Sequence, residues 1–144
     1  MKTTKSSALA MAILVFGLYA CEKDKSTPDP SNSSTSEIVG QGTWKVTLYN
    51  DSGNEETQNF AGYNFTFNTN GTIAAVKNTS TVNGTWNTGV DDSQDKLILD
   101  FGTTVQFSEL NEDWVILEKS ASKIRLEHVS GGNGGTDLLT FEKN

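Results

Sequence analysis

Cysteine and histidine, the side chains that most often carry covalent and metal chemistry, each occur once in this sequence of 144 residues, as Cys21 and His128. One cysteine cannot form an internal disulfide, and one cysteine with one histidine cannot build a Cys/His zinc site or an iron–sulfur cluster. These two residues also do not supply the nucleophile, base and orienting acid of a hydrolytic site. We therefore expect no catalytic residues, no metal and no cofactor, and we do not expect an enzyme.

Cys21 follows a segment with the layout of a secretory signal peptide. Two lysines precede an uncharged apolar run over residues 8–20, which is shorter than the roughly 20 residues that a membrane span needs. Residues 18–21 (LYAC) resemble the lipobox of bacterial lipoproteins, which implies cleavage between Ala20 and Cys21 and acylation of Cys21. The alternative is a chance cysteine behind an ordinary signal peptide.

The residues after Cys21 have the composition of a tether. Residues 26–36 (STPDPSNSSTS) include no large apolar side chain, so they cannot bury enough surface to offset the entropy lost on ordering. We expect a signal peptide over 1–20, a lipidated N-terminus with a flexible linker over 21–38, and a folded domain over 39–144. The lipid on Cys21 would hold the protein in the outer membrane, at its periplasmic face or at the cell surface.

The net charge of the chain excludes one class of partner. The formal net charge is −7 and the pI is about 4.6, whereas binding nucleic acid needs a surplus of Lys and Arg. We therefore expect no nucleic-acid partner.

The loops at residues 50–56 and 91–95 carry hard oxygen ligands of the kind that Ca²⁺ takes. Neither has the spacing of a known calcium loop, and the same residue types form tight turns, so we predict turns there and no metal site.

From residue 40 onward, apolar residues recur at every second position, which is typical of half-buried strands. The one helical candidate is a short turn at residues 37–39. The alternation places Trp44, Val46 and Leu48 on one face, and Asn70-Gly71 is a strong hairpin signal. The predicted strands are residues 43–49, 62–69, 72–77, 82–88, 96–101, 104–110, 113–119, 123–129 and 137–143.

The connections between these strands are too short for the crossovers that parallel pairing requires. The pattern therefore predicts an all-β fold, an antiparallel up-and-down meander of about eight or nine strands. Closing such a meander into a small barrel leaves no free sheet edge. A two-sheet β-sandwich with hairpin connections is the alternative.

The first predicted strand opens with Gly42-Thr43-Trp44. Tyr63-x-Phe65-x-Phe67, the Asn70-Gly71 turn, Gly84-Thr85-Trp86, Trp114-x-Ile116 and a closing LTFEK over 139–143 follow in order. In this order and spacing, residues 39–144 resemble the short lipocalin-like domains of many Gram-negative lipoproteins. The resemblance implies a lipocalin-like barrel in which Trp44 plugs one end, and it implies no particular ligand.

Several large side chains fall at inward positions and would either line a cavity or form the core. They are Trp44, Phe65, Phe67, Trp86, Phe107, Trp114, His128 and Phe141. An eight-stranded barrel is just wide enough to be filled by side chains or to hold one small ligand. With so many aromatic residues on short strands, we expect a mostly packed interior with at most a shallow pocket at one mouth. For His128 we favour a half-exposed position at a strand end over a polar group inside a cavity.

Three functional hypotheses are consistent with these features. The first is a cell-envelope lipoprotein whose non-catalytic barrel binds a small hydrophobic ligand or an envelope component. The second is a structural or interaction lipoprotein whose packed barrel presents its loops to a protein or glycan partner. The third is an enzyme or an inhibitor of one, and the missing nucleophile and base argue against catalysis.

Overall fold

The computed structural model describes residues 33–132 and 134–144. Cys21, the signal segment and residues 21–32 of the predicted linker lie outside the described residues. The helical elements are α1 (Thr35–Val39) and the short 3-10 helices η1 (Thr57–Phe60) and η2 (Phe107–Leu110). The strands are β1 (Trp44–Asp51), β2 (Asn54–Glu55), β3 (Asn64–Phe67), β4 (Thr72–Lys77), β5 (Ser80–Asp91), β6 (Gln94–Asp100), β7 (Asp113–Lys119), β8 (Lys123–Val129) and β9 (Thr136–Lys143).

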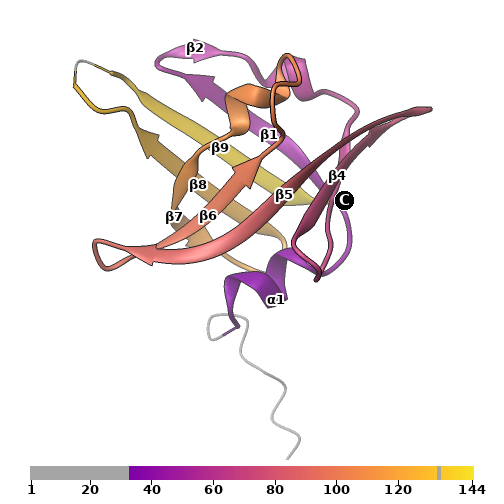
Figure 1. Ribbon diagram of the computed structural model, residues 1–144, viewed down its shortest axis with the longest axis horizontal. Coiled ribbons are helices and arrows are strands. Elements are labelled where there is room, and N and C mark those ends of the chain that lie inside the picture. Colours follow the sequence, from indigo (N-terminus) through magenta and orange to yellow (C-terminus); the bar gives the residue numbers. More distant parts are fainter. Residues whose placement is uncertain (1–32, 133) are drawn as a thin grey trace, which may run out of the picture.

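The strands form one antiparallel sheet that closes on itself (Figure 1). Strand β1 pairs with β3 on one side and with β9 on the other, and β3 to β9 follow in chain order. The short β2 pairs only with the end of β1. The protein is therefore an eight-stranded antiparallel barrel with one extra strand, which confirms the predicted all-β meander and its closure.

Helix α1 lies across one end of the barrel, which we call the α1 end (Figure 1). It begins at Thr35, before the expected domain boundary at residue 39. Ser34 is its N-cap, and its hydroxyl accepts a hydrogen bond from the backbone N–H of Glu37 while the Glu37 carboxylate accepts one from the backbone N–H of Ser34. Ile38 and Val39 are buried against the barrel, so this helix is part of the folded core.

Helix η2 lies at the opposite end of the barrel, which we call the η end because η1 also covers it (Figure 1). The prediction of a strand over residues 104–110 is wrong. The alternation places Val105 and Phe107 on one inward face, but Val105 is 84% exposed and only Phe107 is buried. A 3-10 turn brings residues i and i+3 to the same side, so Phe107 and Leu110 are buried together.

Strand β1 departs from simple alternation at a β-bulge between Val46 and Leu48. The extra residue reverses the facing of the positions after it. Tyr49 is therefore buried, with 2% of its surface exposed, and Leu48 is only partly buried. The expectation that Leu48 shares the inward face of Trp44 and Val46 is wrong for this reason.

Among the described residues, no helix has the length and apolar character to cross a membrane.

Candidate functional site

The barrel interior holds most of the residues that the sequence marks as ligand-lining or core. The seven predicted aromatic residues, Trp44, Phe65, Phe67, Trp86, Phe107, Trp114 and Phe141, are all buried. The Phe65 ring contacts those of Phe107 and Phe141, with ring centroids 6.1 and 5.3 Å apart. The Phe67 ring packs edge-on against Trp86 and Phe141, at 5.6 Å in each case. These side chains fill the interior and pack against one another as a core.

The three indole N–H groups are all satisfied by backbone carbonyl oxygens. Trp44 donates to Val39 at 2.9 Å, Trp86 to Asn68 at 2.9 Å, and Trp114 to Leu110 at 3.0 Å. A buried indole N–H usually needs such a partner. Trp44 and Trp114 therefore tie the barrel wall to α1 and η2, and Trp86 ties β5 to the turn between β3 and β4. None of these three N–H groups is free to bind a ligand.

The η end is covered by a second group of aromatic rings. Phe60 packs edge-on against Tyr49 at 5.3 Å and against Phe107 at 5.6 Å, and Tyr63 packs against Phe107 at 5.0 Å. The Tyr49 hydroxyl donates to the carbonyl oxygen of Glu109 at 3.2 Å. Burial raises the pKa of Tyr49 far above its ordinary value, and nearby carboxylates add to this effect. Tyr49 is therefore a neutral donor that holds η2 over the barrel.

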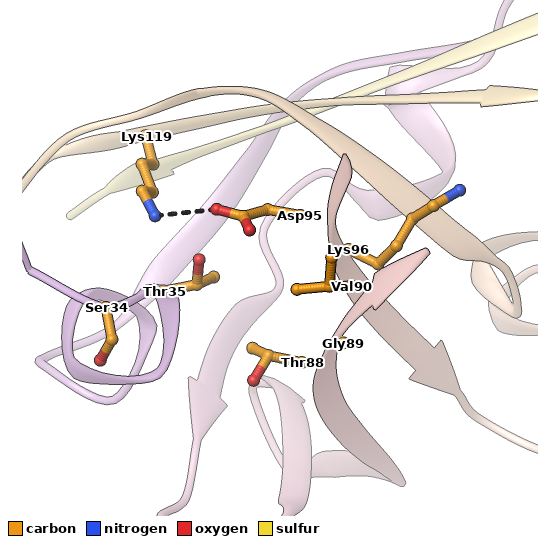
Figure 2. A pocket seen from close by; sticks show the side chains of 8 residues that line it. All are labelled: Ser34, Thr35, Thr88, Gly89, Val90, Asp95, Lys96 and Lys119. Atoms are coloured by element: carbon orange, nitrogen blue, oxygen red, sulfur yellow. Dashed lines mark hydrogen bonds and ion pairs between the residues drawn. The ribbon is translucent and has the colours of Figure 1, made fainter. Parts of the chain in front are cut away.

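A surface groove of about 270 Å³ lies beside the helix at the other end (Figure 2), and we call it the α1 groove. Its lining comes from the start of α1 and from β5, β6 and β7: Ser34, Thr35, Thr88, Gly89, Val90, Asp95, Lys96 and Lys119. The Lys119 ammonium lies 3.2 Å from the Asp95 carboxylate. A second hollow of about 280 Å³, lined by Ser36, Glu37, Thr69 and Trp86, also borders the helix.

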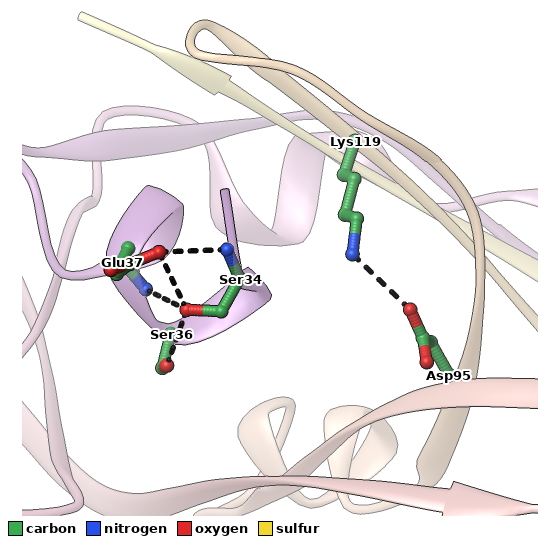
Figure 3. Close-up of polar contacts among 5 residues, drawn as sticks. All are labelled: Ser34, Ser36, Glu37, Asp95 and Lys119. Carbon is green, nitrogen blue, oxygen red and sulfur yellow. Dashed lines mark hydrogen bonds and ion pairs between the residues drawn. The ribbon is translucent and has the colours of Figure 1, made fainter. Parts of the chain in front are cut away.

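Polar contacts hold the α1 side of this groove in place (Figure 3). The Ser34 hydroxyl lies 2.9 Å from the Glu37 carboxylate and 3.1 Å from the Ser36 hydroxyl. Hydrogen bonds from the backbone and side chain of Ser34 lower the pKa of Glu37. The groove thus combines hydroxyl groups and one ion pair with the exposed side chain of Val90, which suits a small molecule that has both polar and apolar parts.

His128 lies at the η end, at the edge of the aromatic core, where its ring packs edge-on against that of Trp114 at 6.1 Å. Its Nε2 atom is 3.3 Å from a Glu112 carboxylate oxygen, and its Nδ1 atom is 3.5 Å from an Asp137 carboxylate oxygen. The His128 side chain is 18% exposed, so it is more buried than the half-exposed strand end that the sequence favours. Asp113 completes a group whose ligand atoms, with those of Glu112 and His128, lie within 4.8 Å of one another.

Sequence reasoning missed this group because its members are dispersed along the chain. Asp113 is the first residue of β7 and Glu112 directly precedes it, and Asp137 is paired with His128 across β8 and β9. The one available signal was Asp137, a carboxylate in phase with the inward residues Leu139 and Phe141 of the strand after His128, and it is buried in the structure. The 91–95 loop, one of the two loops with possible Ca²⁺ ligands, supplies no residue to the group of Glu112, Asp113 and His128. Its Asp95 pairs with Lys119 instead.

Comparison with known proteins finds a solved structure with a similar fold. No family model matches the chain, and no curated protein matches it. Among solved structures, a DUF4847 family protein from Bacteroides vulgatus is similar, with a TM-score of 0.51 and 19% sequence identity. The match covers 77% of this chain and 98% of that one. At this identity the likeness establishes the barrel fold alone.

Proposed function

We propose that the protein is a cell-envelope lipoprotein whose barrel is a non-catalytic interaction module. A lipid on Cys21 would hold it at the membrane, and the two ends of the barrel would be presented to a protein or glycan partner. The filled interior is the observation that carries this proposal. Trp44, Trp114, Phe65 and Phe141 have essentially no exposed surface, so recognition is assigned to the outer surface and the loops.

A hydrophobic ligand inside the barrel would have to displace some of these rings. Removing a buried aromatic side chain from its packing costs about 3–5 kcal/mol, and the ligand would have to recover that energy. The packed interior therefore favours the interaction module over an internal ligand site.

The anchor is supported by the signal segment and by the position of Cys21 at its end. The chain enters the described fold at α1. Residues 22–33 can reach at most about 40 Å when fully extended, so a lipid on Cys21 would keep the barrel close to the membrane surface.

Labelling with radioactive palmitate tests the anchor. The wild-type protein should be labelled and should sediment with the membrane, and the Cys21→Ser variant should lose both properties. A Cys21→Ser variant that keeps the label would overturn the lipoprotein assignment.

Photo-crosslinking tests recognition through the barrel ends. A photoreactive residue at Val105, on the loop before η2, or at Val90, in the α1 groove, should crosslink to a partner in intact cells. The same residue at Val76, on the wall strand β4 and also exposed, is the matched control. Equal crosslinking from all three positions would contradict the proposal.

A second candidate function is the binding of a small amphipathic molecule in the α1 groove. The observation that favours it is that the Lys119 ammonium and the exposed Val90 side chain lie on the same groove of about 270 Å³. Titration with octanoate should then shift the backbone NMR signals of residues 88–90, and Lys119→Ala should weaken the shifts. Shifts spread evenly over the barrel, or unchanged in Lys119→Ala, would exclude this candidate.

A further inference from the structure

Both ring nitrogens of His128 face carboxylates, at 3.3 Å for Glu112 and 3.5 Å for Asp137. A neutral imidazole has one N–H donor and one lone pair. It can therefore donate to only one of the two carboxylates, and its second nitrogen then faces another lone pair. A cation between that nitrogen and the carboxylate would turn this repulsion into attraction.

Asp137 indicates which nitrogen keeps the proton. One of its carboxylate oxygens accepts hydrogen bonds from the backbone N–H and the hydroxyl of Ser52, at 2.9 and 3.0 Å. The other faces His128 Nδ1, a buried atom with no hydrogen-bond partner among the described residues. Metal-bound histidines almost always give their second N–H to a carboxylate, a carbonyl group or water. Asp137 is thus placed to orient the ring so that the Nε2 lone pair points at Glu112.

The distances between the three donor groups suit a small divalent ion. Ligand atoms at about 2.1 Å from a tetrahedral metal lie about 3.4 Å apart. The separation of 3.3 Å between His128 Nε2 and Glu112 already fits. The Asp113 carboxylate lies within 4.8 Å of both. It is half exposed, and its ion pair with Lys96 is long, at 3.8 Å, so a small movement can bring it closer.

The charge of the η end also favours a cation. Burial raises the pKa of Glu109, and the negative charges of Glu56 and Asp51 raise it further. These carboxylates lie around Tyr49, as does Asp137, since all four contribute to its raised pKa. A divalent cation at this end would therefore reduce the mutual repulsion of several carboxylates.

We propose that Glu112, Asp113 and His128 bind a divalent transition-metal ion of the Zn²⁺ type, with Asp137 as the residue that positions the imidazole. The imidazole nitrogen selects this class of ion over Ca²⁺ and Mg²⁺, which take oxygen ligands. Three protein ligands leave coordination positions open to water or to a group of a bound partner. This proposal is independent of the lipid anchor and of the α1 groove.

The test uses the full chain carrying Cys21→Ser, so that the thiol does not compete for metal. Titration calorimetry with Zn²⁺ should show one saturable site. Co²⁺ provides a second readout, because the Trp114 ring lies 6.1 Å from the His128 ring and a bound paramagnetic ion quenches a nearby indole. Co²⁺ should quench part of the tryptophan fluorescence, and Zn²⁺ should restore it.

The variants separate the metal site from a simple ion pair. His128→Gln and Glu112→Gln should abolish the saturable binding and the quenching, and Asp137→Asn should lower the affinity by about 10–100-fold. Glu112 is partly exposed, so its substitution does not threaten the fold. Glu118→Gln, on the outer face of β7 and paired with Arg125, is the matched control and should bind as the unsubstituted protein does.

Three results would overturn the proposal in whole or in part. The absence of saturable Zn²⁺ binding would mean that His128, Glu112 and Asp137 make structural contacts with one another and no metal site. Binding that survives in both His128→Gln and Glu112→Gln would place the metal elsewhere. Unchanged affinity in Asp137→Asn would remove the positioning role of Asp137.

Discussion

The indole Nε1 of Trp44 donates a hydrogen bond of 2.9 Å to the carbonyl oxygen of Val39, which joins the first residue of β1 to the last residue of α1. Trp44 is also paired with Lys143 of β9 and with Phe65 of β3. The Lys143 ammonium lies 5.5 Å from the centre of its ring. One buried side chain thus lies where the barrel closes and where the covering helix is attached.

Trp44→Ala should lower the free energy of unfolding by about 3–5 kcal/mol, because it leaves a large cavity at this junction. Trp44→Phe keeps most of the apolar contact and loses the hydrogen bond to Val39, so its loss should be smaller, about 1–3 kcal/mol. Urea denaturation followed by far-UV circular dichroism measures both. A loss below about 1 kcal/mol for Trp44→Ala would contradict the role of this residue as the closing plug.

Gly84→Ala should destabilise the barrel by about 1–3 kcal/mol through overpacking. A methyl group at this position of β5 would meet the carbonyl oxygen of Asp100 and the ring of Phe101. Gly89→Ala on the same strand is the matched control, because its methyl group would lie 3.6 Å from Ile98, an ordinary contact distance. Thermal denaturation of the two variants compares them, and equal melting temperatures would argue against the tight approach of β5 and β6 at Gly84.

Glu109→Gln should stabilise the protein at neutral pH. The pKa of Glu109 is raised in the folded state, so folding favours its protonated form. The ionised form is therefore unfavourable once the pH exceeds the folded pKa, and the amide removes that disadvantage. Chemical denaturation at pH 7 and at pH 4 measures the effect, which should be present at pH 7 and shrink in acid. A gain that is the same at both pH values would mean that ionisation of Glu109 is not its cause.

Ser34→Ala should destabilise the protein by about 1 kcal/mol, because it removes the N-cap of α1. Ser34→Thr keeps a hydroxyl that can accept from the Glu37 N–H and donate to the Glu37 carboxylate, so it should lose much less. The pKa of Glu37 is lowered by Ser34, so its contribution is present above its unfolded pKa and is lost as the pH falls through the folded pKa. The wild-type protein should therefore lose this contribution in acid, whereas Ser34→Ala should lose less of it. Denaturation curves over this pH range that run parallel for the two proteins would argue against the capping box.

Much of the barrel could be predicted because most strands have one buried face and one exposed face. The predicted ranges 72–77, 113–119 and 123–129 coincide with β4, β7 and β8. Short connections then allow only antiparallel neighbours, and closure removes the two free edges. The same alternation places the aromatic residues at inward positions, where they are predicted to line a cavity or to form the core.

The predictions from sequence are wrong where the backbone departs from the regular pleat of a strand. The bulge in β1 turns Tyr49 inward in place of Leu48, and alternation alone does not reveal an extra residue. At η2, the spacing of three between Phe107 and Leu110 is typical of a 3-10 turn. Val105 and Phe107 are two positions apart, which is the spacing of a strand, so the pattern predicts a strand there. The group around His128 could not be found from sequence because strand register, not spacing along the chain, brings Glu112 and Asp137 to it.

Native mass spectrometry tests the central claim, a packed barrel whose recognition uses its outer surface. The Cys21→Ser protein, purified without detergent, should give the mass of the polypeptide with no lipid-sized adduct. Phe141→Ala provides a positive control, because a large apolar cavity can take up a small apolar molecule such as benzene. A tightly held adduct of lipid size on the protein with Phe141 intact would contradict the packed interior and would establish an internal ligand site instead.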